Sequence, residues 1–172
     1  MLYLCKLITD RNGMKGIRIF ECRGLDSLVV IPEEIKGQPV IELAPYIFSA
    51  QEDYEPEDRR DAFWWGEGEP EELSIVNGNA LTELRLPRTL KKVGAYGFYN
   101  CENLKSLELY STTMDWGAGV FTGCFGVEAI RIYVDETQKS CMKELLMELR
   151  QRLVVSYVGK GQAMLIFSDF FE

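Results

Sequence analysis

The chain has 172 residues, which is enough for one domain with a terminal extension and too few for two domains of ordinary size. Hydrophobic residues make up 47% and charged residues 27%, a composition typical of globular proteins. The formal net charge of -8, from 27 acidic and 19 basic residues, repels phosphate backbones and anionic lipids. We therefore expect a basic or mixed-charge protein as the partner, and neither nucleic acid nor a membrane.

Histidine is absent, which excludes histidine-based nucleophilic catalysis and histidine metal ligands. The cysteines form no CxxC motif, and their odd number favours free, buried thiols. They are Cys5, Cys22, Cys101, Cys124 and Cys141. We therefore expect no cofactor, no metal site and no catalytic residue. A hydrolase with paired carboxylates stays open as an alternative, although the sequence singles out no such pair.

No stretch reaches the roughly 18 consecutive apolar residues that a membrane-spanning helix needs, and the first residues lack the features of a signal peptide. We expect a cytoplasmic location, or a secreted or cell-surface one if a leader has been removed. The first predicted element is a β-hairpin of residues 2–9 and 16–22, because Asn12-Gly13 is a strong hairpin-turn signal between alternating apolar runs. This hairpin (1–24) is predicted to cap the N-terminal end of the fold.

Residues 29–48 form an imperfect copy of the units that follow, with about five extra residues around Lys36-Gly37-Gln38-Pro39. An acidic insertion, residues 51–72, comes next; it carries ten acidic side chains around Phe63, Trp64 and Trp65. Aromatic anchors inside a charged rim are typical of protein interfaces. The alternatives are that these aromatic residues fold onto the body as an extra cap, or that the carboxylates bind a divalent cation.

The middle of the chain repeats with a constant step of 23 residues (107 − 84 and 130 − 107). Leu84, Leu107 and Ile130 form one series of matched positions, and Gly94 with Gly117, Phe98 with Phe121 and Cys101 with Cys124 follow the same step. Each unit begins with a short alternating stretch that suits a strand with one buried face. One unit alone leaves its apolar side uncovered, so the repeat predicts a solenoid of stacked parallel strands.

On the open face of that parallel sheet, the period places Arg85, Glu108 and Arg131 in one row. Neighbouring strands then present a positive, a negative and a positive charge. One interpretation is a cross-strand charge ladder that stabilises the sheet. The other is that this face docks a peptide or protein, and we include the three residues, with Phe63, Trp64 and Trp65, among the candidate partner contacts.

The C-terminal segment, residues 135–172, is predicted to form a second cap. Asp135 and Gln138 have the spacing of a capping box, and apolar residues at helical spacing predict a helix over 136–152. Strands are predicted over 154–158 and 163–167. The terminal Phe170 and Phe171 are expected to pack on the body, or to mediate self-association.

The stretches Leu81-Thr82-Glu83-Leu84-Arg85-Leu86-Pro87 and Val93-Gly94-Ala95-Tyr96-Gly97-Phe98-Tyr99-Asn100-Cys101 resemble the BspA-type bacterial leucine-rich repeat. The likeness covers roughly residues 28–134, and the unit with Tyr110 in place of proline departs from the pattern. It implies an α/β solenoid: a short right-handed superhelix with one parallel sheet and irregular or short helical arms opposite. For function it implies a non-catalytic protein-recognition module, with a self-associating structural protein as the alternative.

Overall fold

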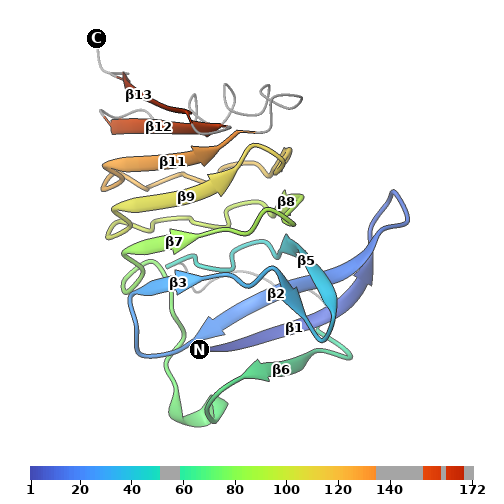
Figure 1. Ribbon diagram of the computed structural model, residues 1–172. Helices are drawn as coiled ribbons and strands as arrows, with labels where there is room; N and C mark the ends of the chain where they lie inside the picture. The colour runs from blue at the N-terminus through green and yellow to red at the C-terminus, as the bar shows by residue number, and fades with distance from the viewer. Residues whose placement is uncertain (51–58, 135–152, 160–161, 169–172) are drawn as a thin grey trace.

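A computed structural model describes residues 1–50 and 59–134, together with the backbone of two strands, residues 153–159 and 162–168. The described chain winds into a β-solenoid in which two sheets face each other across one core (Figure 1). We call these the front sheet and the back sheet. The front sheet has the strand order β13-β12-β11-β9-β7-β3, and the back sheet has the order β10-β8-β5-β2-β1-β6, with β4 paired to β5.

The front sheet confirms the repeat period. Its strands are β3 (Leu28–Val30), β7 (Glu83–Arg85), β9 (Ser106–Tyr110), β11 (Ala129–Tyr133), β12 (Leu153–Gly159) and β13 (Gln162–Ser168). From β3 to β12 the strands are parallel, and the pairing places Leu84 beside Leu107 and Leu107 beside Ile130. Each of these three side chains is only 1% exposed, so the repeat fixes which residues face the core.

The back sheet corrects the expected α/β class. Its strands are β1 (Leu2–Thr9), β2 (Lys15–Arg23), β5 (Gln38–Leu43), β6 (Phe63–Gly66), β8 (Lys92–Val93) and β10 (Asp115–Trp116). The repeat arms, expected to be irregular or helical, therefore contribute short parallel strands. In the described residues the one helical element is a 3-10 turn, Pro70–Glu72. The backbone of each arm forms hydrogen bonds with the neighbouring coils, and the two-residue strands pair with the equivalent strands there.

The N-terminal hairpin is present as predicted, with β1 antiparallel to β2. Its turn is closed by the side chain of Asp10, which accepts hydrogen bonds from the amides of Asn12 and Met14 at 2.9 Å. β2 then pairs in parallel with β5, so the hairpin extends the back sheet beneath the repeats (Figure 1). Tyr3 and Ile19, which face inward, belong to the same buried cluster as the repeat leucines.

The first repeat unit is longer because it contains a second hairpin. β4 (Glu34–Ile35) turns back onto β5 through Lys36 and Gly37. Both turn residues have positive φ, 52° and 75°, as a two-residue type I′ turn requires. The extra residues therefore form this hairpin, and Val29 still pairs in register with Leu84.

Aromatic rings and thiols from successive coils stack between the sheets. Phe48 lies 6.0 Å from Phe98, and Phe98 lies 5.3 Å from Phe121, measured between ring centroids. The thiol of Cys101 donates to the carbonyl of Phe48 at 3.1 Å, and the thiol of Cys124 to that of Phe98 at 3.0 Å. Cys5, Cys22, Cys101 and Cys124 are all buried free thiols, which agrees with the sequence prediction.

Successive coils approach so closely at one corner that glycine is required there. A Cβ atom on Gly94 would clash with the backbone nitrogen of Pro45. A Cβ atom on Gly117 would clash in the same way with the backbone nitrogen of Ala95. The matched glycines of the sequence therefore mark a point of very close contact between coils.

The C-terminal strands β12 and β13 agree with the two predicted strands, and they extend the front sheet by one parallel and one antiparallel pairing. The predicted helix of 136–152 lies outside the described residues, as do Cys141, Phe170 and Phe171. Residues 51–58 of the acidic insertion also lie outside them.

Candidate functional site

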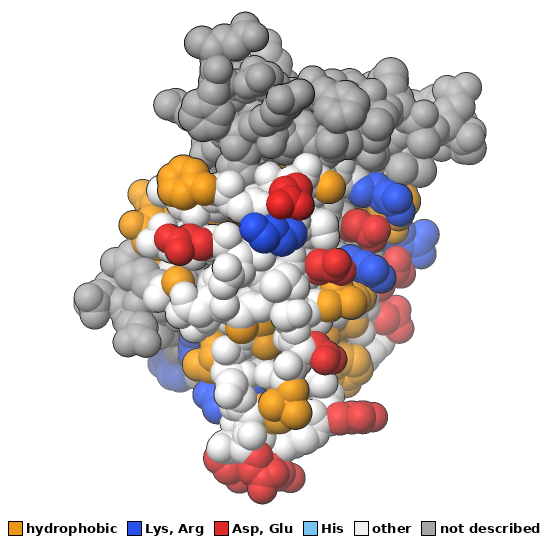
Figure 2. Space-filling model, turned by 90° about the vertical axis from the view of Figure 1, so that its left-hand side faces the viewer, with side chains coloured by type: hydrophobic (Ala, Val, Ile, Leu, Met, Phe, Trp, Pro, Cys, Tyr) orange, Lys and Arg blue, Asp and Glu red, His pale blue; other side chains and the backbone are white. Residues whose placement is uncertain are grey.

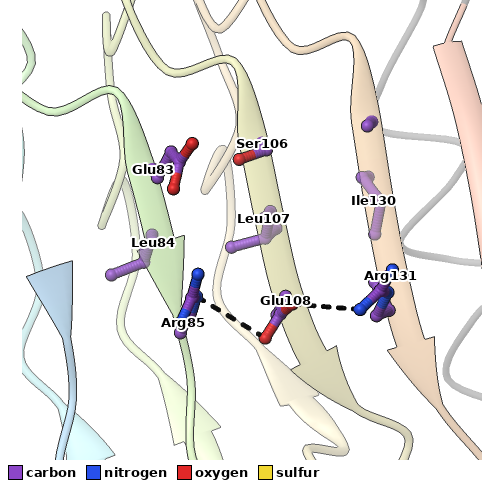
Figure 3. Close-up of a pocket in the computed structure, with 9 residues that line it drawn as sticks. Glu83, Leu84, Arg85, Ser106, Leu107, Glu108, Ile130 and Arg131 are labelled. Atoms are coloured by element: carbon purple, nitrogen blue, oxygen red, sulfur yellow. Dashed lines mark ion pairs between the residues drawn. The ribbon is translucent and has the colours of Figure 1, made fainter. Parts of the chain in front are cut away.

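The charged row predicted on the front sheet consists of Arg85, Glu108 and Arg131, and the strand register places them side by side. A nitrogen of Arg85 (Nε) lies 3.8 Å from one carboxylate oxygen of Glu108, and a nitrogen of Arg131 (Nη1) lies 3.6 Å from the other. Both arginine side chains point toward the shared glutamate (Figure 3). Their exposed fractions, 49% for Arg85 and 55% for Arg131, leave both guanidinium groups in contact with solvent.

A second row runs beside the charged row, two residues earlier in each strand. It consists of Glu83, Ser106 and Ala129, which pair across β7, β9 and β11. Because Ser106 and Ala129 are small and the neighbouring arginines are long, the face is hollowed there. The two rows and the strand backbone between them line a depression of about 240 Å³ (Figure 3).

A third row lies on the other side of the charged row and carries a pair of tyrosines that sequence reasoning missed. Tyr110 and Tyr133 are partners in the register of β9 and β11, and their rings stack with centroids 4.8 Å apart. The sequence does contain the pattern that predicts this pair. The two tyrosines are one repeat step apart, and each follows a residue of the charged row by two positions. Tyr110 occupies the position where the repeat pattern has proline, and this departure from the pattern hides the pairing.

The surroundings of Tyr110 raise the pKa of its hydroxyl above the ordinary value. Burial raises the pKa of Tyr110, and Tyr133 and Glu33 raise it further, while Arg88 opposes the rise. Arg88 itself pairs with Glu33 at 3.2 Å. The front face thus presents, side by side, mixed charges, a hollow and two half-buried phenol rings.

The three candidate aromatic residues of the insertion lie elsewhere, in β6 at the far edge of the back sheet. β6 pairs with β1, so that Phe63 is beside Cys5 and Trp65 is beside Tyr3. Phe63 and Trp65 pack against the core. Trp64 points to the opposite face of the strand, where the guanidinium of Arg23 lies 5.0 Å from its ring centroid. The structure therefore brings Arg85, Glu108 and Arg131 together and separates them from the aromatic group.

Cationic side chains of the N-terminal hairpin and of the first repeat unit contact the insertion. Arg23 donates to the carbonyl of Pro70 at 2.7 Å and pairs with Glu21 at 3.0 Å. The ammonium group of Lys36 lies 4.1 Å from the ring centroid of Phe63. These contacts give Phe63 and Trp65 a structural role at this edge, and they leave Trp64 as the aromatic residue of the three that faces away from the core.

A second charged row, also missed by the sequence reasoning, crosses the back sheet. It runs through β2, β5, β8 and β10 and consists of Arg18, Glu42, Lys92 and Asp115. Arg18 pairs with Glu42 at 2.8 Å, and Glu42 is only 8% exposed. The row lines a depression of about 430 Å³. Lys92 and Asp115 are separated by the repeat step, but charged residues in such short strands give no recognisable alternation.

One side of the solenoid is formed by the turns that lead into the strands of the front sheet, and no continuous hydrophobic patch of the described residues is visible on it (Figure 2). Figure 2 shows hydrophobic side chains there in separate groups between acidic and basic ones. Two large hydrophobic residues of the described chain are strongly exposed, Leu25 at 88% and Phe125 at 78%. Single exposed apolar residues are common on protein surfaces, so they define no site.

Among the described residues, no cluster of three or more His, Cys, Asp or Glu side chains has the arrangement of a metal site. Within the same part of the chain, no helix has the length and apolar character needed to cross a membrane. The front face gathers three of the six sequence-predicted candidates on one exposed surface, whereas two of the three in β6 pack against the core.

Comparison with known proteins gives a family match and two similar structures. Residues 75–147 match the family model of the BspA type leucine rich repeat region. A leucine rich cell surface protein from Faecalibacterium prausnitzii has a similar structure, with 14% identity and a TM-score of 0.44, over 91% of this chain and 41% of that one. A leucine rich repeat protein from T. pallidum gives 16% identity and a TM-score of 0.37, over 74% of this chain and 68% of that one.

This chain therefore spans less than half the length of the first of these two structures. No curated protein matches the sequence. The family match, the repeat period and the stacked coils agree with one another over the central part of the chain. We conclude that the chain carries a BspA-type leucine-rich repeat region over residues 75–147.

Proposed function

We propose that this chain is a non-catalytic protein-recognition module, and that the front face around the charged row binds a second protein of mixed charge. The observation that carries the proposal is the arrangement of Arg85 and Arg131 on either side of Glu108. Both distances, 3.8 Å and 3.6 Å, exceed the length of a strong charge-assisted hydrogen bond. The guanidinium donors are therefore available to a partner.

The energetics favour recognition over stabilisation as the main role of the row. Ion pairs between solvent-exposed side chains contribute about 0.2–1 kcal/mol. Desolvated arginine and tyrosine side chains, in contrast, are enriched among the residues that dominate the binding energy of protein interfaces. The face supplies two arginines and, next to them, the stacked pair of Tyr110 and Tyr133.

The face is also held rigidly before any partner arrives. β7, β9 and β11 each have a hydrogen-bonded strand on both sides, so the backbone under the charged row is fixed. Leu84, Leu107 and Ile130 anchor the same strands in the core. A preformed surface loses little conformational entropy on association, which favours affinity.

The order of charges opposes in-register self-association through this face. If two copies met in antiparallel fashion, Arg85 would face Arg131 of the second copy and the two Glu108 carboxylates would face each other. Like charges in such positions repel. We therefore propose a different protein as the partner; Trp64, on another face, is proposed as a secondary contact. The proposal applies to a cytoplasmic location and to a cell-surface one alike.

The test is affinity capture from the source cell, followed by calorimetry with the purified captured protein. The variant Arg85→Ala/Arg131→Ala is expected to weaken binding at least tenfold, equivalent to about 1.4 kcal/mol. The matched control is Arg11→Ala/Lys92→Ala, which removes two positive charges that line the depression on the back sheet. Equal affinity of the front-face variant and the wild-type protein would refute the proposal.

A further inference from the structure

The charged row has a spacing that selects the secondary structure of its partner. This inference rests on the proposed function and adds the class of ligand. Neighbouring strands in a sheet are about 4.8 Å apart, so the three charges of Arg85, Glu108 and Arg131 span about 9.6 Å in a line across the strands. The complement of this row is an acidic, a basic and an acidic group with the same spacing.

An α-helix meets this spacing and an extended strand does not. Residues i, i+3 and i+7 of a helix share one face and rise about 4.5 Å and about 10.5 Å along the axis. The mismatch with the row is then about 1 Å over its whole length. Residues i, i+2 and i+4 of a strand rise about 6.8 Å and about 13.6 Å, so the third charge misses its partner by about 4 Å.

We propose that the front face binds a single α-helix of the partner protein, which lies across the strands and presents an acid, a base and an acid at i, i+3 and i+7. Its two acidic side chains contact the guanidinium groups of Arg85 and Arg131, and its basic side chain contacts Glu108.

The rows on either side of the charged row fit a helix of this orientation. Adjacent rows are two residues apart along each strand, about 6.8 Å, whereas a helix with its side chains is about 10–12 Å wide. A helix above the charged row therefore extends about 5–6 Å to each side, which leaves both neighbouring rows within side-chain contact of it. On one side, the small side chains of Ser106 and Ala129 leave the depression of about 240 Å³ to receive helix side chains. On the other side, Tyr110 and Tyr133 offer ring surface for apolar contact.

Three fluorescent peptides test the inference by anisotropy titration against the whole chain at low salt. The first is a covalently stapled helix with Glu, Lys and Glu at i, i+3 and i+7. The second is the same helix with Lys, Glu and Lys at these positions. The third is an extended peptide with Glu, Lys and Glu at i, i+2 and i+4. The wild-type chain is expected to bind the first peptide about tenfold more tightly than either of the others.

A charge-swapped chain supplies the decisive control. Arg85→Glu/Glu108→Lys/Arg131→Glu turns the row into its opposite while keeping three exposed charges in alternation, and it is expected to prefer the second peptide. The variant Lys92→Glu, on the back sheet, is expected to bind the three peptides in the same order of affinity as the wild-type chain. Absence of binding, equal binding of the two helices, failure of the swap to reverse the order, or equal binding of the extended peptide would each overturn the inference.

The two proposals fail in different ways. If Arg85→Ala/Arg131→Ala weakens binding of the captured partner but the three peptides bind with equal affinity, the front face binds protein and the helix inference is wrong. If the peptides bind with the expected order of affinity but Arg85→Ala/Arg131→Ala leaves the affinity for the captured partner unchanged, the row recognises a charged helix and the proposed natural binding site is wrong.

Discussion

Leu84 and Leu107 are register partners on neighbouring strands of the front sheet, one repeat step apart in the sequence, and each is 1% exposed. Ile130 continues the same series on the next strand. Each of these side chains therefore packs on an equivalent side chain of the adjacent coil. A solenoid built this way distributes its core over all coils, so that damage to a central coil affects the contacts of both neighbours.

Leu107→Ala, in the middle of this series, is expected to lower the free energy of unfolding by about 2–5 kcal/mol, because it removes buried contacts and leaves a cavity. Chemical denaturation followed by circular dichroism measures the change. Ser106→Ala, the preceding residue on the open face, serves as the control and is expected to change stability by less than about 0.5 kcal/mol. A similar loss of unfolding free energy in both variants would contradict the burial of Leu107.

Gly117→Ala is expected to destabilise the chain by about 1–3 kcal/mol, because the added Cβ would clash with the backbone nitrogen of Ala95. The thermal midpoint measures the effect. Gly13→Asn is the control: Gly13 has a φ of 81°, an added Cβ there would meet no atom within 4 Å, and asparagine tolerates this conformation. If Gly117→Ala were as stable as Gly13→Asn, the coils would be farther apart at this corner than described.

The two charged rows are expected to differ in their contribution to stability. Glu108→Gln on the front sheet is expected to cost less than about 1 kcal/mol, with the loss disappearing at high salt, because its ion pairs are long and exposed. Glu42→Gln on the back sheet is expected to cost more, because Glu42 is nearly buried and accepts a hydrogen bond from Arg18 at 2.8 Å. Denaturation at two salt concentrations compares the variants, and a larger loss for Glu108→Gln would contradict the proposed role of the front row.

Alkaline pH is expected to destabilise the fold through its buried thiols. Burial raises the pKa of Cys5 from 9.0 to about 11, against the opposing charge of Lys36, so the unfolded chain releases this proton at lower pH than the folded chain. The stabilisation is complete below pH 9 and is lost as the pH rises to about 11, a total of roughly 2–3 kcal/mol for this group. Cys5→Ala is expected to flatten the pH dependence of unfolding between these values; an unchanged slope would contradict the shift.

Substitution of Trp65 is expected to destabilise the fold more than substitution of Trp64, because the two side chains lie on opposite faces of β6. Trp65→Ala removes a side chain that packs on the core and lies 5.9 Å from the ring centroid of Tyr3, so it is expected to lower the thermal midpoint substantially. Trp64→Ala removes a ring on the other face of β6 that contacts Arg23, and a smaller loss is expected. The reverse order of midpoints would show that the two faces of β6 have been assigned incorrectly.

The sequence predicts those parts of the fold that recur at a fixed step. The period alone places Arg85, Glu108 and Arg131 in one row, and the strand register confirms their order. The back sheet is missed because strands of two residues, such as Lys92–Val93, are too short to show alternation. The pairing of Trp65 with Tyr3 joins the insertion to the first strand of the chain, and no local pattern encodes a contact between segments so distant in sequence.

The hydrogen bonds between coils connect each repeat to its immediate neighbours, as the side chain of Thr113 does when it donates to the carbonyl of Leu90 at 3.0 Å. Duplication of one repeat unit would therefore insert one strand into each sheet and leave the existing pairings on either side intact. Such an insertion would lengthen the front and back rows by one charge each. Duplication of a repeat unit would thus lengthen the surface proposed to bind a partner, with no change in the residues already present.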